Sequence, residues 1–209
     1  MSECVAIVAE GFIKLEDKGK AACCIILTAL ITTLVCISVA IEGIEPWEFG
    51  LVKDNVSQMV TSDVYEEGLN WVGITKSLIR YPKIIQAIEF SENNATRKAP
   101  RLNTRTKEGL EIKVTCAFQY RLIREDLKKI YGYFEQDYEA KYVRIARATL
   151  LSGVSEWNSI DFWLRREEVG NTLLKKLRIQ FNKVGAKVVH FNLMKIDLPQ
   201  AYDSAIIAT

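Results

Sequence analysis

Few residues of this 209-residue chain are of a type and spacing that could support catalysis. The only histidine is His190, so a site with two imidazoles is excluded, and a serine–histidine–aspartate arrangement would have to use this ring. His190 lies between Val189 and Phe191 in a strand-like run, which is more typical of a structural histidine in a sheet. The glycines form neither G-x-G-x-x-G nor G-x-x-x-x-G-K, so the usual phosphate-binding loops are missing. We therefore predict no catalytic, cofactor-binding or metal-binding residues.

The balance of charges limits the class of partner. The chain has 28 lysine and arginine residues against 26 aspartate and glutamate residues, a formal net charge of +2. A dedicated nucleic-acid binder needs a strongly basic face that offsets the phosphates. We therefore predict no nucleic-acid partner.

One segment differs from the rest of the chain because it carries no charged residue. It runs from Ala21 to Ile41, and at ~1.5 Å per residue a helix of this length spans roughly 31 Å, about one hydrocarbon core. Its four hydroxyl side chains can bond back to carbonyls one turn earlier, which a lipid-exposed helix tolerates. We predict one transmembrane helix over residues 21–42, behind a short arm at residues 1–20. The alternative is a buried core helix.

The residues that flank this segment predict its orientation. Because cytoplasmic flanks are enriched in lysine and arginine, we place the N-terminus on the cytosolic or matrix side and the body on the other. The membrane is the plasma membrane or the mitochondrial inner membrane, and the sequence does not choose between them. The flanking charges are Lys14, Lys18 and Lys20 before the segment, and Glu42, Glu45 and Glu48 after it.

The five cysteines do not predict a disulfide framework. Cys4 lies in the arm, Cys23, Cys24 and Cys36 lie in the apolar segment, and only Cys116 lies in the body, where it has no internal partner. Cys23 and Cys24 are at the cytosolic end of the predicted span, where S-acylation occurs. The alternative is that they are small residues that pack a membrane helix.

The body begins with patterns typical of strands. Apolar and polar residues alternate from Leu110 to Arg121, which predicts a half-buried strand with one wet face. Lys107–Gly109 before it is a predicted hairpin loop in which Gly109 can adopt a positive φ. Shorter strands are predicted at residues 49–53, 58–62, 77–81, 84–90 and 101–106.

The pattern then changes to the period of a helix. Apolar residues recur three to five positions apart from Glu125 to Leu151, which predicts one helix with a core-facing stripe. A second helix, capped by Ser159 or Asp161, extends to about Phe181, and a last strand covers residues 187–197. The order predicts an α+β fold with helices packed on a curved, mostly antiparallel sheet. We expect four residues of the second helix to face inward: Trp163, Leu173, Leu177 and Phe181.

The chain also has aromatic residues that could form contacts between copies. They are Trp71, Trp157, Trp163, Tyr131 and Tyr133.

Five short stretches occur in order along the body: Pro46–Val52, Tyr65–Trp71, Arg80–Lys83, Thr104–Leu110 and Gly185–Pro199. With these stretches the body resembles an SPFH domain, also called Band 7, of the stomatin, prohibitin, flotillin and HflK/HflC family. The resemblance covers about residues 43–208, and we predict the domain itself over residues 43–198. Asn70 and Glu108 depart from the pattern, because histidine and aspartate are common there. The missing hairpin proline in the apolar segment favours a spanning, prohibitin- or HflK-like arrangement.

The resemblance implies a structural role and no enzymatic activity. Such proteins form rings or cages, so we expect a membrane-anchored scaffold that oligomerises and organises a membrane microdomain or partner membrane proteins. The alternative is a regulatory subunit of a membrane protease or channel complex. The expected partners are membrane lipid and other SPFH chains, and no cofactor is expected. Residues 199–209 resemble the start of the C-terminal helix that usually follows, so the chain is expected to be a short variant or a truncated one.

Two polar helix faces are the candidate contacts between copies. Both mix acidic and basic side chains, as charge-complementary neighbours would, although a solvated helix face has the same composition. The candidates are Lys128, Lys129, Glu139, Lys141 and Arg144 on the first face, and Arg165, Arg166, Glu167 and Glu168 on the second.

Overall fold

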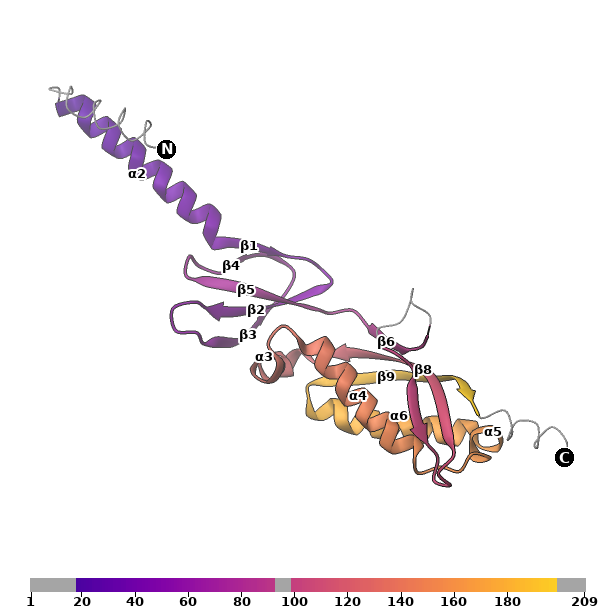
Figure 1. Ribbon diagram of the computed structural model, residues 1–209. Coiled ribbons are helices and arrows are strands. Elements are labelled where there is room, and N and C mark those ends of the chain that lie inside the picture. The colour runs from indigo at the N-terminus through magenta and orange to yellow at the C-terminus, as the bar shows by residue number, and fades with distance from the viewer. Residues whose placement is uncertain (1–17, 93–98, 199–209) are drawn as a thin grey trace, which may run out of the picture.

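The computed structural model describes residues 18–92 and 99–198, with side chains described from Ile25 onward apart from Ser62. The molecule is elongated: a single helix, α2 (Lys18–Ala40), projects from one end of a body of strands and helices (Figure 1). The predicted α+β class is confirmed. The predicted arm at 1–20 lies mostly outside the described residues, and the predicted C-terminal helix at 199–209 lies wholly outside them.

Two small antiparallel sheets follow α2. The β1–β4 pair stands next to the helix, and β2 is the central strand of a second sheet, between β3 and β5. Ile44 of the first sheet is buried against Gly50 of the second, where an added Cβ would lie 2.5 Å from Ile44 Cδ1. The strands are β1 (Ile41–Ile44), β2 (Glu48–Asp54), β3 (Val60–Tyr65), β4 (Gly68–Trp71) and β5 (Lys76–Pro82).

The largest sheet is built around one long strand, β8 (Glu111–Leu122). β9 (Ala186–Asp197) pairs along one edge of β8, so β6 (Gln86–Phe90) and β7 (Leu102–Arg105) share the other edge. Gly109 has a φ of 84° in the loop before β8, as the hairpin requires. The predicted alternation is confirmed, because every second residue from 112 to 122 is buried.

Two long helices cover one face of this sheet (Figure 1). The ring of Phe118 packs edge-on against Phe181, with centroids 5.2 Å apart, and Tyr120 packs against Tyr142 at 5.3 Å. These rings form the centre of the core, where the apolar sides of the two long helices meet the apolar face of β8. The helices are η1 (Arg124–Asp126), α3 (Leu127–Phe134), α4 (Tyr138–Val154), α5 (Asp161–Leu164) and α6 (Arg166–Lys183).

The structure corrects the predicted helices. The single helix predicted over residues 125–151 is two helices, α3 and α4, because the backbone turns at Glu135, which has a φ of 54°. The Tyr81 hydroxyl donates to the carbonyl of Glu135 at 2.9 Å and stabilises this break from another sheet. The second predicted helix is also divided, at Arg165. Neither Ser159 nor Asp161 caps it, because Ser159 donates to Glu108 and Asp161 lies within α5.

The ends of α2 and of the first strands also differ from the predictions. The helix ends at Ala40, and Ile41 is the first residue of β1, so the predicted helix end at residue 42 is two residues too late. The strands β1 and β4 were not predicted, because each has only four residues. The strand predicted at residues 58–62 is β3, which begins and ends later.

Candidate functional surfaces

The first candidate surface is α2 itself. Its large apolar side chains between Ile25 and Val39 are all 46–67% exposed, and they lie on every side of the helix. Its hydroxyls bond within the helix, as Thr28 Oγ1 does to the carbonyl of Ile25 at 2.9 Å and Ser38 Oγ to that of Val35 at 2.8 Å. In the part of the chain that the structure describes, no helix meets the combined length and hydropathy of a membrane span. The span from Ala21 to Ile41 therefore stays a prediction.

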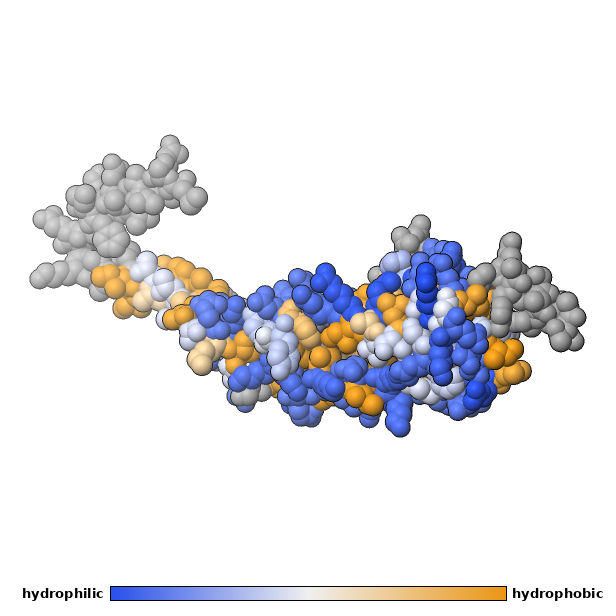
Figure 2. All heavy atoms as spheres, turned by 60° about the horizontal axis from the view of Figure 1, so that its bottom comes forward, coloured by the Kyte–Doolittle hydropathy of each residue, from blue (hydrophilic) through white to orange (hydrophobic). Residues whose placement is uncertain are grey.

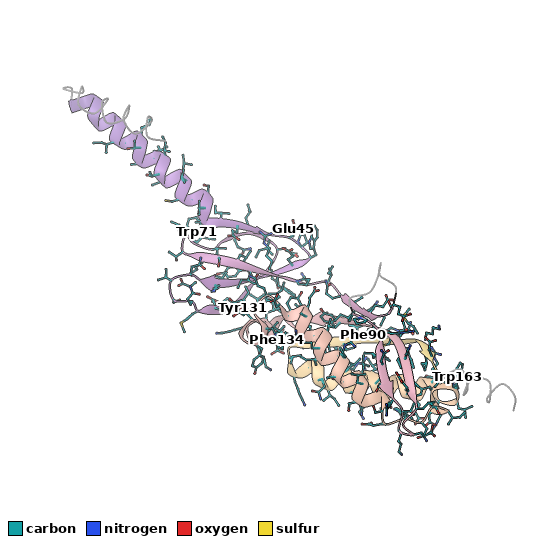
Figure 3. The ribbon with its side chains drawn as sticks, in the orientation of Figure 1. Glu45, Trp71, Phe90, Tyr131, Phe134 and Trp163 are labelled. Atoms are coloured by element: carbon teal, nitrogen blue, oxygen red, sulfur yellow. The ribbon has the colours of Figure 1, made fainter. Side chains whose placement is uncertain are left out.

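The apolar surface continues from α2 onto one face of the β1–β4 pair. Ile41 lies opposite Trp71 and Gly43 opposite Leu69, and opposed residues of antiparallel strands share a face. Leu69 is 82% exposed and Trp71 is 62% exposed (Figure 3). The carbonyl of Ala40 accepts hydrogen bonds from the backbone of residues 72 and 73, at 2.9 and 3.2 Å, so the end of the helix is bonded to this sheet. Figure 2 shows hydrophobic atoms on the helix and where it meets the body.

The described residues do not form a catalytic cluster around the single histidine. His190 is exposed on β9, opposite Gln119 of β8. It lines a shallow depression with Arg166, Glu167 and Asn171 of α6, and the residues of this depression include neither a serine nor a cysteine. No group of three or more potential metal ligands occurs in the described part of the chain.

The two cysteines with described side chains have opposite environments. Cys116 is buried in β8, and burial raises the pKa of its thiol to about 12. Its thiol is therefore protonated and unreactive near neutral pH. Cys36 is exposed on α2. The side chains of Cys23 and Cys24, the candidate acylation sites, lie outside the described residues.

The first predicted contact face is solvent-exposed on α3 and α4. On α4, Lys141 and Arg144 lie opposite the apolar stripe, which is formed by buried residues such as Tyr142, Ala146 and Leu150, whereas Glu139 directly follows the buried Tyr138 at the start of the helix. The turn at Glu135 divides the five exposed side chains of this predicted face between α3 and α4. They are Lys128, Lys129, Glu139, Lys141 and Arg144.

The second predicted contact face is partly engaged inside the molecule. Arg165 donates to Asp161 Oδ1, through Nε at 3.1 Å, and this interaction holds the pKa of that carboxyl below its ordinary value. Arg166 donates to the backbone carbonyls of residues 193 and 194 at 2.6 and 2.8 Å, and so ties α6 to β9. Glu167 and Glu168 are exposed beside them. Glu168 Oε2 also lies 3.8 Å from Arg165 Nη1.

The tryptophan predicted to face inward on the second helix does not do so. Trp163 is 56% exposed and its neighbour Leu164 is 77% exposed, at the end of the body opposite α2 (Figure 3). The prediction failed because α5 is a separate four-residue helix that buries Phe162 instead. Leu173, Leu177 and Phe181 of α6 are buried, as predicted.

The arrangement of β8, its neighbours and the two covering helices agrees with a comparison against family models. The model described as SPFH domain / Band 7 family matches residues 43–209. The chain belongs to the SPFH domain / Band 7 family. Members of this family are commonly membrane scaffolds and are generally not enzymes. A comparison with curated proteins found no match.

The stretches that carry the SPFH resemblance lie on the sheets and turns of the body. Pro46–Val52 leads into β2, Tyr65–Trp71 forms the β3–β4 turn and β4, and Gly185–Pro199 includes β9. Asn70, in the position where histidine is common, donates to the carbonyl of Glu66 at 3.0 Å. The SPFH pattern thus locates the backbone of the domain. The exposure of Leu69 could be found only from the structure. A strand of four residues, such as β4, is too short for its sequence to show which face is buried.

Proposed function

We propose that this SPFH protein is a single-pass membrane scaffold that assembles side by side with other copies into a ring or cage, and so organises a membrane microdomain or partner membrane proteins. One observation carries the proposal: exposed apolar side chains surround α2 and continue on one face of the adjoining β1–β4 pair. The described residues leave this surface uncovered. A lipid bilayer would cover it.

The size of this surface favours a bilayer over a small soluble ligand. Burying a large aliphatic side chain contributes roughly 1.5–3 kcal/mol, and nine such residues between Ile25 and Val39 are exposed. Their combined transfer is therefore on the order of 10 kcal/mol or more. No lysine, arginine, aspartate or glutamate occurs between Ala21 and Ile41, so no charge has to be desolvated in the hydrocarbon core.

Anchoring also favours assembly. Copies that share one membrane plane and one orientation meet at a much higher effective concentration than copies in solution, so weak lateral contacts suffice. The lysines before the apolar segment favour an orientation with the N-terminus on the cytosolic or matrix side and the SPFH domain on the other side. Protease treatment of intact vesicles tests this orientation, and digestion of the body from the cytosolic side would contradict it.

The experiment for the anchor is alkaline carbonate extraction of membranes that contain the full chain. We expect the wild-type protein to stay in the membrane pellet. Replacing Ile31 and Leu34 together by arginine should shift it to the supernatant, because each charge costs roughly 2.5–3.5 kcal/mol in the hydrocarbon core. Replacing both by alanine is the matched control and should leave the protein in the pellet. Release of the wild-type chain by carbonate would contradict the membrane proposal.

The experiment for assembly is the native mass of the chain after extraction with its lipids. A scaffold should be recovered as a high-mass species, whereas an isolated subunit of 23.8 kDa would contradict the proposal. Replacing His190 by glutamine should leave the high-mass species unchanged, because this exposed ring has no part in the proposed contacts.

A further inference from the structure

An apolar projection lies at the end of the body opposite α2. It consists of Ile160, Trp163 and Leu164, which are 38%, 56% and 77% exposed, and we refer to it as the α5 apex. Figure 2 shows hydrophobic atoms at this end of the body. Exposed tryptophan is unusual on a surface with no partner and is the residue most often found at the energetic centre of interfaces.

The α5 apex stands on a fixed base. Phe162 is buried beneath it, and Asp161 accepts hydrogen bonds from the Arg165 side chain and from the backbone N–H of Asn158 at 3.2 Å. Ser159 Oγ donates to Glu108 Oε2 at 2.8 Å and joins this region to the β7–β8 hairpin. A preorganised apolar group loses little conformational entropy when it binds. The α5 apex is therefore suited to insertion into a partner.

The same chain has a groove that matches such an insertion. A groove of about 510 Å³ runs between α4 and α6 on the side away from the sheet, and we refer to it as the α4–α6 groove. Ile145 and Ala148 of α4 and Ile179 of α6 supply its apolar lining, and Ile179 is 50% exposed. Thr149, Ser152 and Gln180 also line it, and their oxygen atoms offer acceptors for an indole N–H.

The charges around the two surfaces are complementary. Beside the α5 apex, Arg165 is paired with Asp161 and also with Glu168, whose Oε2 lies 3.8 Å from Arg165 Nη1, and Glu167 and Glu168 are both exposed. Beside the groove, Lys176 is paired with Glu156 at 2.5 Å. On α4 next to the groove, Lys141 and Arg144 are exposed and basic.

We propose that the α5 apex of one copy seats in the α4–α6 groove of the next copy, with Glu167 and Glu168 facing Lys141 and Arg144. This proposal rests on the scaffold function proposed above. A second copy is the occupant because the chain carries both complementary halves, and because anchored copies meet repeatedly in one plane. Since the two surfaces differ, the contact is head-to-tail, and repetition of the contact continues until a ring closes.

The test uses two full-length variants that each lack one half of the contact. Replacing Trp163 and Leu164 by glutamine removes the apex, and replacing Ala148 by arginine fills the groove. All three residues are exposed, so both variants should retain the circular dichroism spectrum and melting temperature of the wild type. Each variant alone should lose the high-mass species by at least roughly tenfold. Replacing Tyr133, an exposed aromatic residue of α3, by glutamine is the matched control and should change nothing.

Mixing the two variants gives the decisive result. The apex variant keeps an intact groove and the groove variant keeps an intact apex, so the mixture should form one-to-one pairs that grow no further. A charge exchange sharpens the assignment: Glu167→Lys with Glu168→Lys should weaken assembly, and adding Lys141→Glu with Arg144→Glu should restore it.

The outcomes separate the two proposals. If both variants assemble like the wild type, or if the folded variants fail to pair when mixed, the apex–groove contact is wrong and the scaffold function stands. If the wild-type chain is a monomer with its native lipids, both proposals fail.

Discussion

The β8-centred sheet and the β1–β4 pair are both antiparallel, and each has one apolar face, but protein covers only one of these faces. Phe118 and Tyr120 of β8 lie under α4 and α6, and neither ring is more than 1% exposed. Leu69 and Trp71 of β4 are mostly exposed. A two-residue period therefore predicts that a strand has an apolar face, but it does not predict what covers that face.

The largest effect should come from a charge on the covered face. Phe118→Asp places a carboxylate among Tyr120, Phe181 and their neighbours, where its desolvation costs several kcal/mol, a large part of the stability of a domain. We expect the body to lose its cooperative thermal transition. Lys113→Gln, on the wet face of the same strand, should change the free energy of unfolding by less than about 0.5 kcal/mol. Equal melting curves for the two variants would contradict the assignment of the covered face.

The sequence predicted this covered face well because its signal is local. Every second residue of β8 is apolar over a long run, and Leu173, Leu177 and Phe181 repeat at the spacing of a helix. Such patterns can be recognised within one short segment, without knowledge of how the rest of the chain folds.

The break between α3 and α4 depends instead on a distant residue. Phe134 and Tyr138 are four positions apart, as in an unbroken helix, so the spacing does not reveal the turn between them. The hydrogen bond that stabilises the turn comes from Tyr81, in another sheet. The candidate surfaces are equally non-local, since the α4–α6 groove requires two helices that only the fold brings together. The exposed residues on each helix could be listed from sequence, but their partner across the groove could not.

A smaller effect should follow from a methyl group between the two covering helices. In Gly153→Ala the new Cβ would lie 2.5 Å from Cδ2 of the buried Leu173, so this side chain must move or α4 and α6 must separate. We expect a loss of roughly 1–3 kcal/mol in the free energy of unfolding, measured with urea. Gly132→Ala in α3 is the matched control, because its Cβ meets nothing within 4 Å. It should stabilise the body by about 0.4–1 kcal/mol, and a loss of stability at both positions would contradict the close approach of α4 to α6.

The pH dependence of stability should report on the base of the α5 apex, an apolar surface that is exposed but held in place by polar contacts. The hydrogen bond from Arg165 lowers the pKa of Asp161 in the folded chain. Its contribution to stability is therefore complete above the unfolded pKa of about 3.9, and it is lost as the pH falls through the lower folded value. Asp161→Asn should lower stability at pH 7 and should make the remaining stability less dependent on pH below about 4. If the variant and the wild type lose stability in parallel over this range, the ion pair does not stabilise the apex.

Substitutions on the uncovered apolar face of the β1–β4 pair should have the smallest effect on folding. Their effect on contact with the membrane should be large. Replacing Leu69 and Trp71 by serine removes apolar area that is exposed in the folded chain, so the free energy of unfolding of the body should change by less than about 0.5 kcal/mol. The same kind of substitution at Phe118 would destabilise the body by several times as much. If the β1–β4 face lies on lipid, its loss should reduce quenching of tryptophan fluorescence by brominated lipids in vesicles that contain the full chain. Trp71→Phe removes only the indole and is the control that gives the share of the signal due to this residue. Unchanged quenching in both variants would mean that the uncovered face does not touch the bilayer, and its apolar residues would then require a protein partner.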